Sequence, residues 1–304
     1  MNPDIVCLGE PLLEFNQVAG QDHFLRGHGG DTSNCAIAAA RQGASVGYVT
    51  AVGKDDFGDS FMELWRREAV DVSRVMRSPD AHTGIYFVSH GKTGHSFSYF
   101  RAGSAASRLK PQDIPEDYIG RANILHVSGL SQAISDSACD AVFRAIDIAR
   151  DNQVKVSYDT NLRLKLWPLE RARAIIHAAM SQCDIALPGL DDARQLTGLQ
   201  DADAIVDFYL GLGASVVALT LGAEGTLVAT GDKRQRLSGR AVKPVDATAA
   251  GDTFDGAFLS ELTRGENPFE AAMHANAAAA LSTQGFGAVA PMPTREQVLA
   301  FLDQ

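Results

Sequence analysis

Short apolar runs alternate with amphipathic stretches along most of the chain. Buried strands are predicted for runs such as "DIVCLGE", "SVGYVTAVG", "ANILHVSGL", "VKVSYDT", "CDIALPG" and "SVVALTLG". Helices are predicted for stretches with apolar residues at helical spacing, such as "SNCAIAAARQG", "FGDSFMELWRREA", "DSACDAVFRAIDIARDN", "ERARAIIHAAMSQ" and "DADAIVDFYLGLG". From Gly251 onward the pattern is almost entirely helical. This alternation predicts an α/β fold with a mainly parallel central sheet flanked by helices.

Two stretches, residues 14–30 and 82–104, interrupt the alternation. Each has short strand-like runs and glycine turns without an intervening helix, which predicts hairpins attached to the edge of the sheet. We expect them to form a small β-sheet lid from about residues 12–29 and 82–102 of a single domain spanning 1–304. The "GKTG" at 91–94 is expected to be a turn, because Tyr86 stands where a P-loop needs glycine.

Composition and charge exclude several classes of protein. The 304 residues are 45% hydrophobic and 21% charged, and no apolar run approaches the roughly 20 residues of a membrane span. The formal net charge of -10 argues against nucleic acid or an anionic membrane as the main partner. The first residues lack a secretion signal, and four widely spaced cysteines, Cys7, Cys35, Cys139 and Cys183, are expected to be reduced core residues. We therefore expect a soluble cytoplasmic protein, in which any anionic ligand depends on local arginines and helix N-termini.

The segment "DATAAGDTFDGAF", residues 246–258, combines small residues with carboxylates ahead of a helical pattern. Unpaired N–H groups in a helix's first turn bind anions, and the small residues Ala249, Ala250 and Gly251 would let a phosphoryl group approach them. Asp252 beside that anion could accept the proton of an attacking hydroxyl, although a helix-capping role is the alternative. Asp255 is expected to face solvent or to support the site. Asp246 could bind a cation or form a turn.

A second glycine cluster, "GHGGDTSN", leads into the first long helix. Gly29 and Gly30 would let the main chain approach a ligand's hydroxyls, and Asn34 offers a donor and an acceptor to a polyol. The alternative is a glycine turn followed by a helix capped by Asp31 or Thr32.

Polar residues also follow the predicted strand "VKVSYDT". Asp159, Asn161 and Arg163 alternate along "DTNLR" and would share one face, at the carboxyl end of a strand, where sheets of this class bind ligands. Arg101 lies on the predicted lid, so two arginines could grip a carboxylate, or each could form an ordinary surface ion pair.

Together, "GGDTSN", "DATAAGDTFDGAF" and a β-lid in an α/β chain resemble the ribokinase-like (PfkB) carbohydrate kinases over essentially the whole chain. Within that family, "GEPLLEF", "TGIYF", "FSYFRAGSA", "LHVSGLSQAIS" and "DTNLRLKLW" resemble 2-keto-3-deoxygluconate kinases more than ribokinase, adenosine kinase or fructokinase. The resemblance implies ATP-dependent phosphorylation of the 6-hydroxyl of 2-keto-3-deoxygluconate. The alternatives are another sugar kinase on this scaffold, such as a fructokinase or a kinase of a different keto-deoxy acid, and a non-catalytic sugar-acid sensor. A nicotinamide-dependent dehydrogenase would fit the alternation but lacks its glycine fingerprint.

The resemblance also implies roles for individual residues. Asp252 would be the general base, and the backbone of Ala249, Ala250, Gly251 and Asp252 would form the anion hole. The sugar acid would contact Gly30, Asn34, Tyr86, Tyr99, Arg101 and Arg163. ATP would lie along Thr220, Gly222 and Gly225 and against Asn276.

Cations enter the resemblance as well. Mg²⁺ would bridge the phosphates. Gly189 replaces a family asparagine that helps to place the metal, which leaves Asp192 to act through water. A monovalent cation such as K⁺ near Asp246 and Thr248 is a further implication, as is a homo-oligomer formed through the lid.

Overall fold

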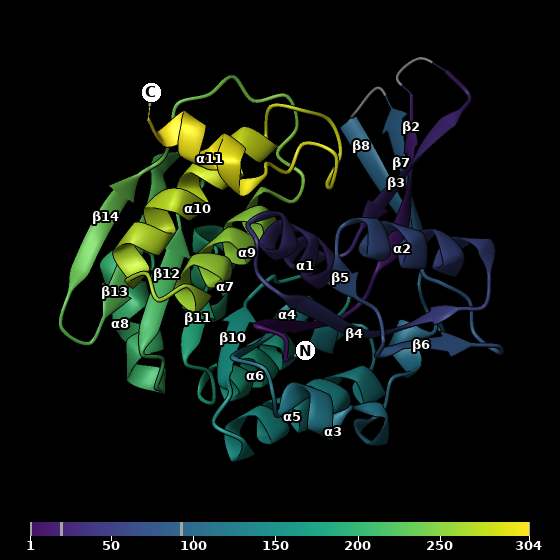
Figure 1. Cartoon of the computed structure of the whole chain (residues 1–304), viewed down its shortest axis with the longest axis horizontal. Coiled ribbons are helices and arrows are strands. Elements are labelled where there is room, and N and C mark those ends of the chain that lie inside the picture. Colours follow the sequence, from purple (N-terminus) through teal and green to yellow (C-terminus); the bar gives the residue numbers. More distant parts are fainter. Residues whose placement is uncertain (1, 19–20, 92–93, 304) are drawn as a thin grey trace.

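A large sheet, a small sheet and two layers of helices make up the computed structural model, which describes residues 2–18, 21–91 and 94–303 (Figure 1). The strands of the large sheet follow the order β14 (Arg234–Ser238), β13 (Gly225–Thr230), β12 (Val216–Thr220), β11 (Ile185–Leu187), β10 (Lys155–Asp159), β9 (Ile124–Ser128), β1 (Ile5–Leu8), β4 (Val46–Gly53) and β5 (Val70–Asp71), with β6 (Val75–Ser78) also paired to β4. From β12 to β5 and β6 the neighbours are parallel, which confirms the expected mainly parallel sheet. Strands β13 and β14 are antiparallel, and the sequence pattern did not predict them.

Helices cover both faces of the large sheet. One face packs against α1 (Asp31–Arg41), α2 (Asp56–Arg67), α9 (Ala250–Thr263), α10 (Pro268–Ser282) and α11 (Arg295–Leu302). The other packs against α3 (Glu116–Ile119), α5 (Asp136–Asp151), α6 (Leu169–Met180), α7 (Leu190–Thr197) and α8 (Ala202–Leu212), while α4 (Gly129–Ala133) directly follows β9. Successive residues of β1 enter opposite cores, because side chains alternate across a strand: Ile5 and Cys7 face one, Val6 and Leu8 the other. This two-sided burial explains the continuous apolar runs in the sequence.

The two predicted hairpins form the small sheet. β2 (Leu12–Gln17) pairs with β3 (Phe24–Gly29), and β7 (Ile85–Gly91) pairs with β8 (Gly94–Phe100). β2 and β7 pair in parallel, so the hairpins join each other, and in the described residues they do not join the large sheet. Attachment to the edge of the large sheet was therefore a wrong expectation. The four strands stand apart at the upper right of Figure 1, and residues 19–20 of the lid and 92–93 of the predicted turn lie outside the described residues.

Close packing of α1 and α9 brings distant parts of the chain together. A Cβ at Gly256 would lie 2.4 Å from the carbonyl oxygen of Cys35, so only glycine permits this approach. The first turns of both helices meet at the carboxyl ends of β1, β9 and β10. Residues 31–34 thereby come to lie beside Asp252.

The predicted cysteine state is also observed, since all four cysteines are buried and free. Among the described residues, no helix has the length and apolar character needed to cross a bilayer.

Candidate active site

The N-terminus of α9 presents an open backbone surface. Ala249, its N-cap, has φ 61°, a left-handed conformation that is uncommon for a residue with a side chain. No side-chain cap bonds this helix end, and Ala250 N–H donates to Ala247 O at 3.2 Å. The N–H groups of Gly251 and Asp252 are therefore the ones available to an anion. A Cβ at Gly251 would have no neighbouring atom within 4 Å, which indicates open space in front of the turn. Local strain and an uncapped helix end are features of a binding site rather than of a passive turn.

Asp252 occupies that first turn without capping the helix. Its Oδ2 accepts a hydrogen bond from Asn34 Nδ2 at 2.8 Å. Burial and the neighbouring Asp31 raise the pKa of Asp252 to about 7, against the opposing effects of the Asn34 hydrogen bond and the Arg163 charge. A carboxylate with this pKa can take a proton near neutral pH. The capping alternative is therefore wrong, and the geometry agrees with a general base.

Three more carboxylates surround Asp252. Asp255 is buried, so the expectation that it might face solvent is wrong. Burial and the neighbouring Asp159 and Asp252 raise the pKa of Asp255, and burial with Asp31 and Asp252 raises that of Asp159. Asp31 is buried in the first turn of α1 and accepts hydrogen bonds from Ser128 and Asn161. This cluster was not predicted, because its members come from three separate segments.

The glycine pair before α1 has a backbone role. Gly30 is the N-cap of α1 with φ 110°, and a Cβ there would lie 2.3 Å from the carbonyl oxygen of Glu10. Neither Asp31 nor Thr32 caps the helix, so that alternative is wrong. Asn34 Oδ1 is buried without a hydrogen-bond partner among the described residues. Because Nδ2 is held by Asp252, Oδ1 is the atom that Asn34 can offer to a ligand hydroxyl.

The segment after β10 forms a fixed loop. Asn161 has φ 23°, and its N–H donates to Asp159 Oδ1 at 3.0 Å. Asp192 in α7 accepts the N–H of Leu162 at 2.8 Å. Arg163 is exposed, and in the described part of the chain it forms no ion pair, its Nη1 donating only to Leu162 O at 3.0 Å. Its charge nevertheless lowers the pKa of both Asp252 and Asp192, so Arg163 is within electrostatic reach of the predicted base.

One face of the lid carries aromatic residues toward this loop. Tyr86 and Tyr99 stack with ring centroids 5.7 Å apart, and the Tyr86 hydroxyl donates to Glu14. Lys165 Nζ lies 5.7 Å from the centre of the Phe97 ring, so β8 reaches over the loop of Arg163. The sequence did not predict a role for Glu14, because nothing in its position along a strand indicates the contact with Tyr86.

Arg101 does not stand on the surface. It is 8% exposed, its Nη2 donates to Glu10, which is fully buried, and its guanidinium lies 5.7 Å from the Tyr99 ring centroid. The surface ion pair considered for Arg101 is thus a buried pair, and Glu10 was not predicted. Burial raises the pKa of Glu10, and the Arg101 charge opposes that rise. Arg101 Nε has no partner among the described residues and remains available to a ligand.

The residues predicted for the nucleotide lie at one end of β12 and β13. Thr220 ends β12, Gly222 has φ 62° in the intervening turn, and Gly225, with φ 101°, begins β13. Asn276 is buried in α10, where its Oδ1 accepts from Thr226 Oγ1 at 2.7 Å. These contacts give Asn276 a supporting position behind the turn.

The residues predicted to bind cations differ in the hydrogen bonds that they form within the protein. Asp246 Oδ1 accepts from the N–H and the hydroxyl of Thr248 at 2.9 and 2.7 Å, and Oδ2 accepts from Gly287 N–H at 2.9 Å. Asp246 therefore forms the turn considered in the sequence.

Gly189 is the N-cap of α7, and burial raises the pKa of Asp192. Within the described ranges no three His, Cys, Asp or Glu side chains lie close enough together to hold a metal ion by themselves. A Mg²⁺ ion that is bound mainly by phosphate and water needs only one carboxylate from the protein, and Asp192 could supply it.

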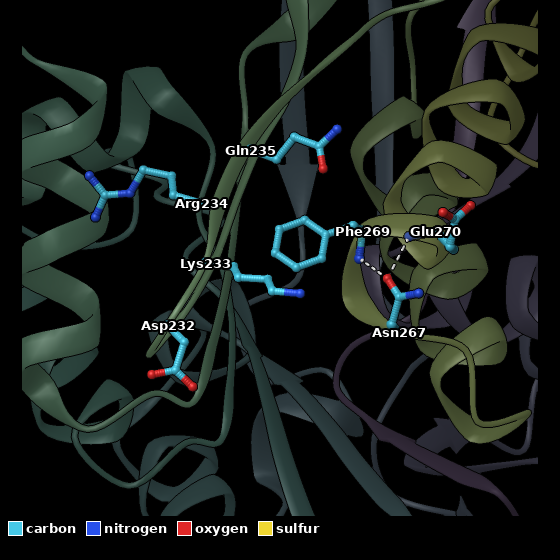
Figure 2. A pocket seen from close by; sticks show the side chains of 7 residues that line it. All are labelled: Asp232, Lys233, Arg234, Gln235, Asn267, Phe269 and Glu270. Carbon is cyan, nitrogen blue, oxygen red and sulfur yellow. Dashed lines mark hydrogen bonds between the residues drawn. The ribbon is translucent and has the colours of Figure 1, made fainter.

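A surface hollow lies elsewhere (Figure 2). Lys233 points toward Phe269 there, and Asn267 accepts hydrogen bonds from the N–H groups of Phe269 and Glu270. Residues 231–233 join β13 to β14, at the end of β13 opposite Thr226, and residues 234 and 235 begin β14. The hollow is therefore remote from the carboxyl ends of the strands where Asp252 lies.

Comparison with known proteins assigns the family. The family model described as "pfkB family carbohydrate kinase" matches residues 2–295. The chain belongs to this family of carbohydrate kinases. Members of the pfkB family are phosphotransferases with an alcohol acceptor, and the ribokinase-like fold expected from the sequence is confirmed.

Individual relatives span the whole chain. A 2-dehydro-3-deoxygluconokinase of Bacillus subtilis (strain 168) is 35% identical over 99% of this chain and 96% of its own length. Probable fructokinase-5 of Arabidopsis thaliana is 32% identical over 96% of this chain and 95% of its own. A double mutant of Vibrio cholerae O395 fructokinase, solved with fructose, ADP and a potassium ion, is 30% identical with TM-score 0.89 and covers 99% of both chains. The pfkB kinase described here is thus similar both to sugar-acid and to neutral-sugar kinases.

Proposed function

We propose that this pfkB kinase transfers the γ-phosphoryl group of ATP to the 6-hydroxyl of 2-keto-3-deoxygluconate, giving 2-keto-3-deoxy-6-phosphogluconate. The observation that carries the proposal is Arg163, an exposed cation that forms no ion pair in the described chain and whose charge acts on both Asp192 and Asp252. An anionic sugar can use that charge, whereas a neutral hexose cannot.

The reaction follows from the first turn of α9. Asp252, with its pKa near 7, takes the proton from O6 as the O6–phosphorus bond forms. The bond from the γ-phosphorus to the bridging oxygen breaks, and ADP leaves with that electron pair. The open N–H groups of Gly251 and Asp252 stabilise the charge on the transferring group.

Substrate orientation uses the remaining polar atoms. Asn34 Oδ1, which is buried and unpartnered among the described residues, accepts a sugar hydroxyl, and Tyr86 and Tyr99 line the lid side. The backbone of Gly30 approaches the sugar closely. Arg163 binds the carboxylate, and Arg101 contributes through Nε while Glu10 holds its other end. Closure of the lid excludes water, which would otherwise compete for the phosphoryl group.

The nucleotide lies along Thr220, Gly222 and Gly225, with Asn276 behind the turn. Asp192 would hold Mg²⁺ through water, and the bound ion would neutralise part of the phosphate charge. A monovalent cation beside the turn of Asp246 and Thr248 belongs to the same proposal, in keeping with the potassium ion of the Vibrio cholerae structure.

The test is ATP consumption with Mg²⁺ and, in parallel, 2-keto-3-deoxygluconate, 2-keto-3-deoxygalactonate, fructose and ribose. Turnover confined to the keto-deoxy acids supports the proposal, and R163A should lower kcat/KM for them by at least about tenfold because a charged hydrogen bond is lost. R144A is the matched control, since it removes an exposed cation of α5 that pairs with Glu116 and should change kcat/KM little. Equal effects of both variants would contradict the role of Arg163.

Fructokinase activity is the second candidate. It is favoured by the relatives at 30–32% identity that are named fructokinases. Turnover of fructose alone, unaffected by R163A, would establish it and would end the sugar-acid proposal. A sugar-acid sensor would bind the acid without turnover, and D252N would then leave its affinity unchanged.

Association through the lid and a cytoplasmic location complete the proposal. Phe100 and Phe24 are 57% and 37% exposed on the lid face opposite Tyr86 and Tyr99, and a second lid could cover them. The four free, buried cysteines fit a reducing compartment. Sedimentation of the protein and of F100S would test the association, because loss of the apolar side chain should favour the monomer.

A further inference from the structure

Asp31 connects three segments that carry the site. Its Oδ2 accepts from Ser128 Oγ at 2.5 Å and from Asn161 Nδ2 at 2.8 Å, and its Oδ1 accepts from Thr32 N–H at 2.8 Å. Ser128 ends β9, and Asn161 lies two residues beyond the end of β10, the neighbouring strand. Each partner donates to Asp31, so both oxygens of its side chain act as acceptors.

One of these contacts bears on the Arg163 loop. Asn161 has φ 23°, a backbone conformation that persists only where the surroundings hold it. Its side chain is held by Asp31 and its N–H by Asp159. Since Arg163 follows two residues later, the bond to Asp31 helps to determine where the guanidinium can lie.

The charge of Asp31 also reaches Asp252. The groups that face Asp252 are Asp31, Asn34 and Cys35 from α1, Asp159 from the end of β10, Asp255 from α9 and Arg163 from the loop. After burial, Asp31 has the largest effect on the pKa of Asp252, and it raises that pKa. Asn34 and Arg163 act in the opposite direction.

We propose that Asp31 is a positioning residue of the phosphoryl-transfer site: it orders the Arg163 loop through Asn161 and holds a carboxylate close to Asp252. This inference rests on the proposed function and adds to it a residue that acts through Asn161 and Asp252. Asp31 would thereby link the binding of the sugar by the Arg163 loop to the protonation of Asp252.

The charge effect is tested by titration of ¹³C-carboxyl-labelled protein, with the Asp252 signal assigned from its absence in D252N. The Asp252 midpoint, near 7 in the unaltered protein, should fall by about one pH unit in D31N, because a like charge has been removed while the volume is kept. The pH at which kcat/KM falls on the acidic side should decrease by a similar amount. S33A is the matched control: Ser33 lies in the same helical turn and accepts a hydrogen bond from Trp65 at 2.9 Å, away from the site. An unchanged midpoint in D31N, or an equal shift in S33A, overturns the inference.

The positioning effect is tested by N161A, which keeps the Asp31 charge. We expect KM for the accepted sugar to rise about tenfold with little change in the pH limb, since the loop loses one charge-assisted hydrogen bond. If D31N does not fold, N161A decides alone, and an unchanged KM overturns the inference.

Failure of this inference is distinguishable from failure of the proposed function. If no sugar is turned over, the proposed kinase activity fails. The carboxyl titration needs no activity and still shows whether Asp31 controls Asp252.

Discussion

Asn34 Nδ2 donates a hydrogen bond of 2.8 Å to Asp252 Oδ2, joining residues that lie 218 positions apart. The bond exists because Gly256 lets α9 approach α1 to within backbone contact. It places a donor on the carboxylate that we assign as the base, and so it affects both the direction in which Asp252 points and its pKa.

We expect the acidic limb of kcat/KM to lie near pH 7, with activity lost as pH falls through it, because the base must be deprotonated. The Asn34 hydrogen bond lowers the pKa of Asp252. N34A should therefore move the limb upward by up to about one pH unit. A pH profile measured with saturating ATP checks this, and a downward shift would contradict the assignment of Asp252.

Gly251 should be essential for activity but dispensable for folding. A Cβ there points into open space, where the phosphoryl group would lie, so G251A should lower kcat/KM by about 100-fold. The helix itself should gain about 0.5–1 kcal/mol in free energy of unfolding. The matched control is G211A, at an exposed helical glycine of α8 that also faces open space, which should gain similar stability without loss of activity. Equal activities of the two variants would exclude a phosphoryl site at α9.

The buried Glu10–Arg101 pair should be important for stability as well as for the lid. Removal of one partner leaves an uncompensated buried charge, which costs about 3–5 kcal/mol. Urea denaturation of E10Q, R101M and the double variant should therefore show coupling, with the double variant more stable than the sum of the single effects predicts. E116Q, which breaks the exposed pair with Arg144, should cost less than about 1 kcal/mol. Additive effects of E10Q and R101M would show that the pair is not coupled.

His126 should make the protein sensitive to acid. It is buried in β9 beside Ser157, and burial lowers its pKa from 6.5 to about 3. The unfolded chain therefore binds a proton below pH 6.5 that the folded chain does not, and stability is lost as pH falls from 6.5 toward 3. Between pH 6.5 and 5, H126Q should show a pH dependence weaker by up to about 1.4 kcal/mol per unit in its free energy of unfolding. Equal slopes would mean that another group is responsible.

The sequence alone determined the elements and much of the motif chemistry. Continuous apolar runs predicted the parallel strands, because both faces of the sheet are covered, and small residues before an apolar helical pattern predicted the open first turn of α9. Strand β14 escaped prediction because residues 234–236 are polar and exposed, which leaves little of the apolar pattern on which strand prediction depends. Strand β13 is buried and has an apolar run, "GTLVAT", that was overlooked.

Tertiary structure alone decided which charges meet. Asp31, Asp159 and Asp255 surround Asp252 only because helix packing and strand order bring three segments to one edge of the sheet. Asp255 faces the interior for the same reason. Likewise, Arg101 is bound by Glu10 because the lid folds back onto the residues that follow β1. Such contacts depend on distances between residues far apart in the chain, which spacing along the sequence does not contain, and so burial, ion pairing and shifted pKa values emerge only in the folded protein.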